Sequence, residues 1–166
     1  SRTGLGPQPD TQLEFGPVND DLRLVAASAG DVNGDGFGDL IVGHTSSQGA
    51  HPGHGRALVF CGSTNGLTRQ PAWEVTCDRA LLHPKSTSRI EHFGWSVAAA
   101  GDIDGDGCDD VVVGAPWAEQ DDVDEGLVFV YHGTRAGLER HPRRVIEGNE
   151  THASLGFVVG SAGDLN

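Results

Sequence analysis

The sequence predicts an all-β fold made of β-propeller blades, with about two full blades of four antiparallel strands and an orphan strand at each end. Three observations predict it: an internal repeat, short strand-like segments within each copy, and dense turn punctuation from 25 glycines and 8 prolines in 166 residues. Repeats of several tens of residues are typical of solenoids, propellers and arrays. Four short strands per copy match the content of one propeller blade.

The repeat has a constant step of 71 positions. The segment AASAGDVNGDGFGDLIVG, residues 26–43, matches VAAAGDIDGDGCDDVVVG, residues 97–114. The same step brings RALVFCGSTNGL, residues 56–67, onto LVFVYHGTRAGL, residues 127–138. A third copy begins at Leu155 with LGFVVGSAGDLN. The repeated unit is therefore a whole structural element and extends well beyond its acidic loop.

Each copy divides into strand-like runs bounded by glycine, proline or acidic turns. The expected strands are 24–30, 39–43, 56–61 and 72–75 in the first copy and 95–101, 110–114, 126–132 and 143–147 in the second. Residues 12–18 and 155–163 are expected to be the orphan strands. The predicted organisation is a lead-in with the end strand of a preceding blade (1–21), a first blade (22–78), an insertion loop (79–92), a second blade (93–148) and the start of a third, incomplete repeat (149–166).

Composition limits the partners. A formal net charge of −13 and a pI near 4.7 disfavour nucleic acid and anionic membrane surfaces, because the protein's field repels phosphate. No apolar run is long enough to span a bilayer, so we expect no membrane insertion, and any targeting segment is expected to be removed or to lie outside this sequence. Cys61 and Cys77 fall on consecutive strands and are either bridged or two buried thiols.

Two acidic loops, DVNGDGFGD and DIDGDGCDD, carry oxygen-bearing side chains at positions 1, 3, 5 and 9. Calcium takes about six to eight oxygen ligands, and one tight loop can supply most of them. The predicted calcium ligands are the side chains of Asp31, Asn33, Asp35 and Asp39 with the carbonyl of Phe37, and the side chains of Asp102, Asp104, Asp106 and Asp110 with the carbonyl of Cys108. Asp164 and Asn166 begin a third, incomplete loop. The alternative is a solvated acidic turn.

The second loop is flanked by Phe93-Gly94 and by Gly114-Ala115-Pro116. With these flanks it resembles the FG-GAP repeats of integrin α-subunit N-terminal propellers, which also occur in secreted phospholipases. The resemblance implies two structural calcium ions, an extracellular or cell-surface location, and calcium hairpins on the face opposite the ligand-binding face. The first repeat departs from the pattern with Leu22-Arg23, and the third has Leu155-Gly156.

The expected function is a calcium-stabilised extracellular module for protein–protein interaction and adhesion, not an enzyme, because no catalytic constellation is visible. The alternatives are the propeller portion of a secreted, phospholipase-like hydrolase and a self-assembling structural unit. Propellers close rings of about four to eight blades. Two blades therefore imply a homo-oligomer or a fragment of a longer chain that completes the ring.

Other features have two interpretations each. The loop with Trp117, Asp121, Asp122 and Asp124 is either a partner-facing docking surface or a solvated acidic loop. The run with His44, His51 and His54 is either a transition-metal site or a polar loop, and Asn149 begins a glycosylation sequon.

Overall fold

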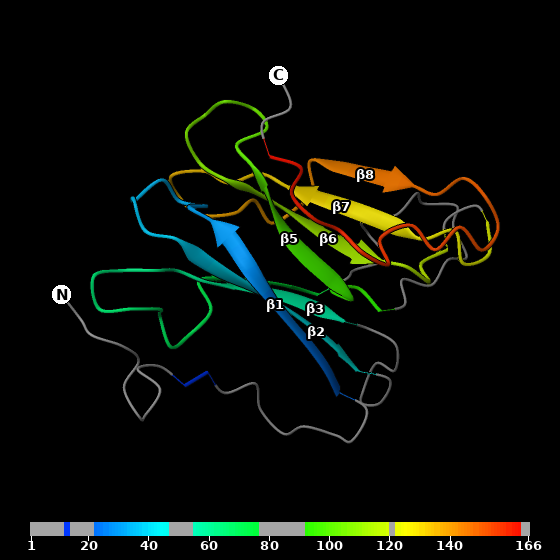
Figure 1. The fold of residues 1–166 in the computed structure, drawn as a ribbon, viewed down its shortest axis with the longest axis horizontal. Coiled ribbons are helices and arrows are strands. Elements are labelled where there is room, and N and C mark those ends of the chain that lie inside the picture. The colour runs from blue at the N-terminus through cyan, green and yellow to red at the C-terminus, as the bar shows by residue number, and fades with distance from the viewer. Residues whose placement is uncertain (1–11, 14–21, 47–54, 77–91, 120–121, 164–166) are drawn as a thin grey trace.

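The computed structural model describes residues 12–13, 22–46, 55–76, 92–119 and 122–163 (Figure 1). Its strands are β1 (Leu22–Gly30), β2 (Asp39–Ser46), β3 (Arg56–Phe60), β4 (Trp73–Thr76), β5 (Ser96–Gly101), β6 (Asp110–Ala115), β7 (Leu127–Tyr131) and β8 (Arg144–Glu147). They form two four-stranded sheets in the orders β1-β2-β3-β4 and β5-β6-β7-β8, and every neighbouring pair is antiparallel. The predicted all-β fold with two blades is confirmed.

The eight strands lie where the repeat predicts them, with β2 longer than expected. The prediction of a strand over residues 155–163 is wrong. A strand needs a hydrogen-bonded neighbour, and within the described part of this segment the only bridge is a single parallel pair between Leu155 and Gly126. Of the other expected orphan strand, residues 12–13 are not in a strand and residues 14–18 lie outside the described residues. No helix that could span a bilayer occurs in the ranges the structure describes.

The main core lies between the two sheets, where β1 packs beside β5 (Figure 1). Side chains in a strand alternate between the two faces of its sheet. Ile41 and Val59 accordingly belong to the core between the sheets. Their neighbours Val42, Leu58 and Phe60 form a second cluster on the opposite face of the first sheet. Both faces of the first sheet are therefore apolar, as stacked blades require.

Aromatic rings hold the two sheets together. Phe93 packs edge-on against Phe129 with ring centroids 5.2 Å apart, and both side chains are fully buried. Trp73 of β4 packs edge-on against Tyr131 of β7 at 5.1 Å. The Trp73 indole N–H also donates a hydrogen bond to the Glu139 carbonyl at 3.0 Å. The two contacts of Trp73 join the outer strand of the first blade to the second blade, whereas the Phe93–Phe129 pair lies within the second repeat.

Glycines mark where one repeat docks on the next. A Cβ at Gly43 in β2 would meet the carbonyl oxygen of Gly94, so only glycine lets the second repeat approach this closely. A Cβ at Gly114 in β6 would meet the carbonyl oxygen of Gly156 in the same way. The start of the third repeat therefore docks on the second blade as the start of the second repeat docks on the first, although the residues described up to 163 form no strand.

Candidate metal centres

Each acidic loop is the hairpin between the first two strands of its sheet. Both first strands end in a register irregularity, between Ser28 and Gly30 and between Ala99 and Gly101. The two glycines have positive φ angles of 77° and 75°, a conformation that residues with a Cβ rarely adopt. The chain thus turns out of the ladder immediately before the first acidic residue of each loop.

In the first loop, backbone amides orient the side chains. The Asp31 carboxylate accepts hydrogen bonds from the Asp35 amide at 3.0 Å and from the Gly36 amide at 2.7 Å. The Asn33 side-chain oxygen accepts from the Asp35 amide at 3.0 Å, and Asp35 accepts from the Phe37 amide at 2.9 Å. The side-chain oxygens of positions 1, 3 and 5 are therefore turned toward the loop's own backbone.

The second loop repeats this arrangement. Asp102 accepts from the amides of Gly105, Asp106 and Gly107 at 2.8, 3.0 and 2.9 Å. One carboxylate oxygen from each of Asp102, Asp104 and Asp106 lies within 4.8 Å of the other two. Three like charges at this separation repel one another unless a cation lies among them.

The ninth residue of each loop, Asp39 or Asp110, is the buried one, with 4% and 0% of its surface exposed. Asp39 accepts from the amides of Val32 and Gly62 at 2.9 and 2.8 Å. Asp110 accepts from the equivalent amides at 3.0 and 2.8 Å. Burial raises the pKa of both carboxyls, and these backbone hydrogen bonds act in the opposite direction. Each of these carboxylates is thus fixed in place at the base of its loop.

The residue that follows the third strand of each blade also reaches its loop. His132 places Nδ1 2.8 Å from the Asp104 carboxylate, and its side chain is 16% exposed. The repeat step aligns His132 with Cys61, whose thiol interacts with Asn33 of the first loop. Burial, and after it the nearby carboxylates, raise the pKa of the Cys61 thiol. The sequence interpretation missed both neighbours, although the 71-residue step aligns them.

The two loops are in direct contact. The Asp109 carboxylate accepts a hydrogen bond from the Asp31 amide at 2.7 Å, and the Asp109 amide donates to the Asp31 carbonyl at 2.8 Å. Arg135 donates to the Gly34 carbonyl at 3.2 Å. A Cβ at Gly30 would collide with the Asp109 carboxylate. The second loop therefore supports the backbone from which the Asp31 side chain of the first loop projects.

The donor chemistry of both loops fits a hard divalent cation. Every side-chain donor at positions 1, 3, 5 and 9 is a carboxylate or amide oxygen. Each carboxylate oxygen has two lone pairs, so one hydrogen bond to a backbone amide leaves capacity for an ion. The amides also fix the side chains, which reduces the ordering that binding requires.

Comparison with known proteins agrees with this geometry. The model of the FG-GAP repeat matches residues 25–51 and 93–131. The chain is 31% identical over 158 residues to integrin alpha pat-2 of Caenorhabditis briggsae, and 35% identical over 130 residues to integrin alpha-3 of Mus musculus. These matches cover 85% and 75% of the chain, and 12% and 11% of the relatives. The chain contains FG-GAP repeats and is homologous to integrin α subunits.

A third relative, integrin alpha-V of Gallus gallus, is 29% identical over 147 residues, which cover 82% of the chain and 13% of the relative. The chain thus spans about a tenth of the length of the curated relatives it matches.

The FG-GAP motif itself has a structural basis here. The amides of Gly94 and Trp95 both donate to the Gly114 carbonyl, at 3.1 and 3.2 Å, so the FG and GAP segments of one repeat are bonded together.

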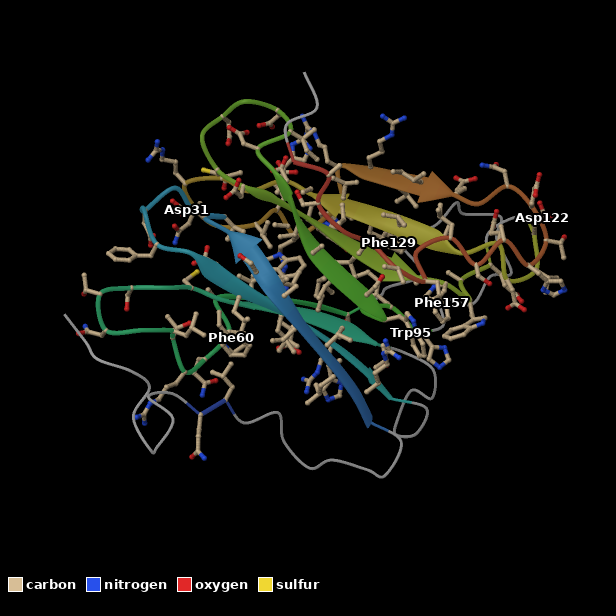
Figure 2. The ribbon with its side chains drawn as sticks, viewed as in Figure 1. Asp31, Phe60, Trp95, Asp122, Phe129 and Phe157 are labelled. Carbon is tan, nitrogen blue, oxygen red and sulfur yellow. The ribbon has the colours of Figure 1, made fainter. Side chains whose placement is uncertain are left out.

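Of the predicted partner-facing residues, Trp117, Asp122 and Asp124 lie at the other end of the strands from the acidic hairpins. Figure 2 shows Asp31 at one end and Trp95 with Phe157 at the other. Trp117 packs edge-on against Trp95 at 4.6 Å and against Phe157 at 5.9 Å, and the Arg23 guanidinium lies 3.8 Å from the Trp95 ring centroid. Trp117 is thus part of an aromatic cluster, in which Phe157 is 49% exposed.

The acidic loop next to this cluster is anchored to the segment after β8. Asp122 accepts a hydrogen bond from the Thr151 hydroxyl at 3.2 Å, and Asp124 lies 3.3 Å from His152 Nδ1. Glu125 is completely buried beneath them. These two contacts connect the described part of the loop to the segment after β8.

The remaining predicted residues lie partly outside and partly inside the described ranges. Asp121, Asp164 and Asn166 lie outside the described residues, as do His51, His54 and Cys77. His44 lies in β2 and not in a loop. Cys61 and Cys108 are free thiols. Asn149 is exposed and its side-chain amide donates to the Glu147 carbonyl at 2.9 Å.

Proposed function

We propose that the chain is a calcium-stabilised, extracellular β-propeller module that serves adhesion through protein–protein interaction. The observation that carries the proposal is the pair of acidic hairpins at equivalent strand junctions, whose carboxylates are oriented by their own backbone amides. Homology to integrin α subunits favours an adhesion-related module. The predicted domain boundaries, with blades at 22–78 and 93–148, are part of this proposal.

Calcium would have a structural role in both loops. The side chains at positions 1, 3, 5 and 9 would hold one ion in each loop, together with the carbonyls of Phe37 and Cys108. The ion would supply positive charge where the carboxylates otherwise repel one another. Because Asp39 and Asp110 begin β2 and β6, a bound ion would tie each loop to its sheet. No step of chemistry depends on the ion.

Thermal denaturation tests the calcium proposal. An ion that binds only the folded state stabilises it by about 2.7 kcal/mol per site at one hundred times its Kd. For a chain of this length that corresponds to a rise of about 5–11 °C in Tm per site. We expect Tm to rise with calcium and to rise less in Asp106→Asn, which removes one ligand charge from the second loop. Equal Tm values in calcium and in chelator would refute a structural role for calcium.

We place the partner-binding surface at the end opposite the hairpins. The support is the exposed aromatic ring of Phe157 beside Trp117, together with the anchored carboxylates of Asp122 and Asp124. Aromatic residues are enriched in the centres of protein interfaces, and anchored loops lose little entropy on binding. The carboxylates would favour a basic partner.

Two alternative functions can be distinguished from this proposal by experiment. A propeller portion of a secreted hydrolase requires a catalytic domain in the same natural chain, whereas the relatives named above are integrin α subunits and none is named for an enzymatic activity. A self-assembling unit would give a discrete oligomer whose blade number closes a ring. Light scattering in calcium and in chelator distinguishes such an oligomer from a monomer.

A further inference from the structure

The second acidic loop lies beside an imidazole nitrogen, a potential metal ligand that the first loop lacks. His132 Nδ1, one oxygen of Asp104 and one oxygen of Asp110 all lie within 4.8 Å of one another. These donors come from three places in the chain: the loop itself, the start of β6, and the residue after β7. Asp110 is completely buried and the His132 side chain is 16% exposed, so the fold brings the group together.

An imidazole nitrogen changes which ions such a site prefers. Calcium and magnesium take oxygen ligands, whereas imidazole suits zinc and its neighbours in the first transition row. We propose that His132, Asp104 and Asp110 form a mixed nitrogen–oxygen site for a divalent transition metal, with zinc as the reference ion. This inference deepens the proposed function, on which it rests, because it assigns the two loops different metal preferences.

One of the three ligand pairs already lies near the spacing that zinc requires, and both distances to Asp110 are at most 4.8 Å. Zinc binds nitrogen and carboxylate oxygen at about 2.0–2.2 Å in a tetrahedron, which places ligand atoms about 3.3 Å apart. His132 Nδ1 and the Asp104 oxygen are 2.8 Å apart, so about half an ångström of opening would admit the ion between them. The Asp104 side chain is 41% exposed, which leaves a side open for a water molecule as the fourth ligand.

The protein already supplies the outer support that metal ligands need. The Asp110 carboxylate accepts hydrogen bonds from the amides of Gly133 and Ile103 at 2.8 and 3.0 Å. Hydrogen bonds of this kind orient metal-binding carboxylates and commonly change metal affinity by about 10- to 100-fold. Gly133 directly follows His132, so one short turn positions both the imidazole and its carboxylate neighbour.

The first loop is a natural internal control. It has Asn33 where the second loop has Asp104, and Cys61 where the second loop has His132. Among the described residues, no comparable group of three histidine, cysteine or carboxylate ligands forms there. In the first loop a thiol replaces the imidazole, but no three such ligands lie together there among the described residues, so zinc is expected to compete with calcium only at the second loop.

Equilibrium dialysis followed by elemental mass spectrometry tests the inference on the full chain. Zinc alone and calcium alone are each measured for the wild type, His132→Gln and His152→Gln. His152 is the matched control, because it also lies beside an aspartate, at 3.3 Å, but is 69% exposed and remote from the loops. We expect His132→Gln to lose one zinc equivalent and to keep its calcium, while His152→Gln equals the wild type. Far-ultraviolet circular dichroism verifies that both variants are folded.

The outcomes separate this inference from the proposed function. Equal zinc uptake by His132→Gln and the wild type would overturn the mixed site, whatever the calcium result. Loss of one zinc equivalent in His132→Gln from a chain that binds no calcium would support the mixed site and refute the calcium proposal. If the chain binds neither ion, both fall. Loss of a zinc equivalent in His152→Gln as well would also overturn the assignment to His132.

Discussion

Removing the Asp109 carboxylate should destabilise the chain through the neighbouring blade. Its oxygen accepts the Asp31 amide at 2.7 Å in a partly buried setting. A hydrogen bond to a charged group contributes roughly 1.5–3 kcal/mol, and partial exposure favours the lower end. For Asp109→Ala we therefore expect a loss of about 1.5 kcal/mol in the free energy of unfolding, and a fall of about 3–6 °C in Tm. Asp109→Asn keeps an acceptor oxygen, so we expect its free energy of unfolding to lie between that of the wild type and that of Asp109→Ala.

The same substitution tests the contact between the loops. In an Asp106→Asn background, which weakens the second loop, a calcium titration reports mainly the first. Asp109→Ala should lower the calcium affinity of the first loop by up to about tenfold, since about 1.4 kcal/mol corresponds to a factor of ten. A Tm within about 1 °C of the wild type, together with unchanged calcium affinity, would refute the idea that Asp109 supports Asp31.

The remaining predictions concern packing. Gly43→Ala should lower the free energy of unfolding by about 1–3 kcal/mol, because its Cβ would collide with the carbonyl oxygen of Gly94 in the next repeat. A Cβ at Gly38 meets nothing within 4 Å, so Gly38→Ala should be close to neutral. Equal Tm values for the two variants would contradict the docking role of Gly43. Trp73→Phe should cost about 1 kcal/mol in chemical denaturation, because it deletes the hydrogen bond to the Glu139 carbonyl; unchanged stability would show that this bond contributes nothing. Burial raises the pKa of the Cys108 thiol and shields it from reagents. Site-resolved mass spectrometry should therefore find Cys108 alkylated only after denaturation. Rapid alkylation of Cys108 in the folded chain would contradict its burial.

The sequence predicted the blades because repeat and strand pattern are local properties of the chain. The continuous apolar run Leu40-Ile41-Val42 is typical of a strand buried on both faces, and the structure places Ile41 in one core cluster and Val42 in the other. The acidic loops were equally readable, because their oxygen-bearing side chains lie within nine consecutive residues. The wrong strand at residues 155–163 has a physical cause, since a pattern can make a segment suitable for a strand but cannot supply its hydrogen-bonded neighbour.

Contacts between repeats were not predictable in the same way. Asp109 is an ordinary loop residue in the sequence, and its role depends on the distance between two hairpins that lie 71 positions apart. His132 was likewise hidden, because the turn after β7 brings it to the loop that precedes β6. The alignment of the two copies pairs His132 with Cys61, yet only the folded chain shows that this position faces the acidic loop.

Counting the calcium ions bound per chain tests directly whether the two acidic loops are calcium sites. Equilibrium dialysis against calcium, with elemental analysis of the protein, gives the number of ions per chain. We predict two ions for the wild type, one for Asp35→Ala, one for Asp106→Ala and none for the double variant. A wild-type chain that is folded and binds no calcium, or a double variant that keeps both ions, would contradict it.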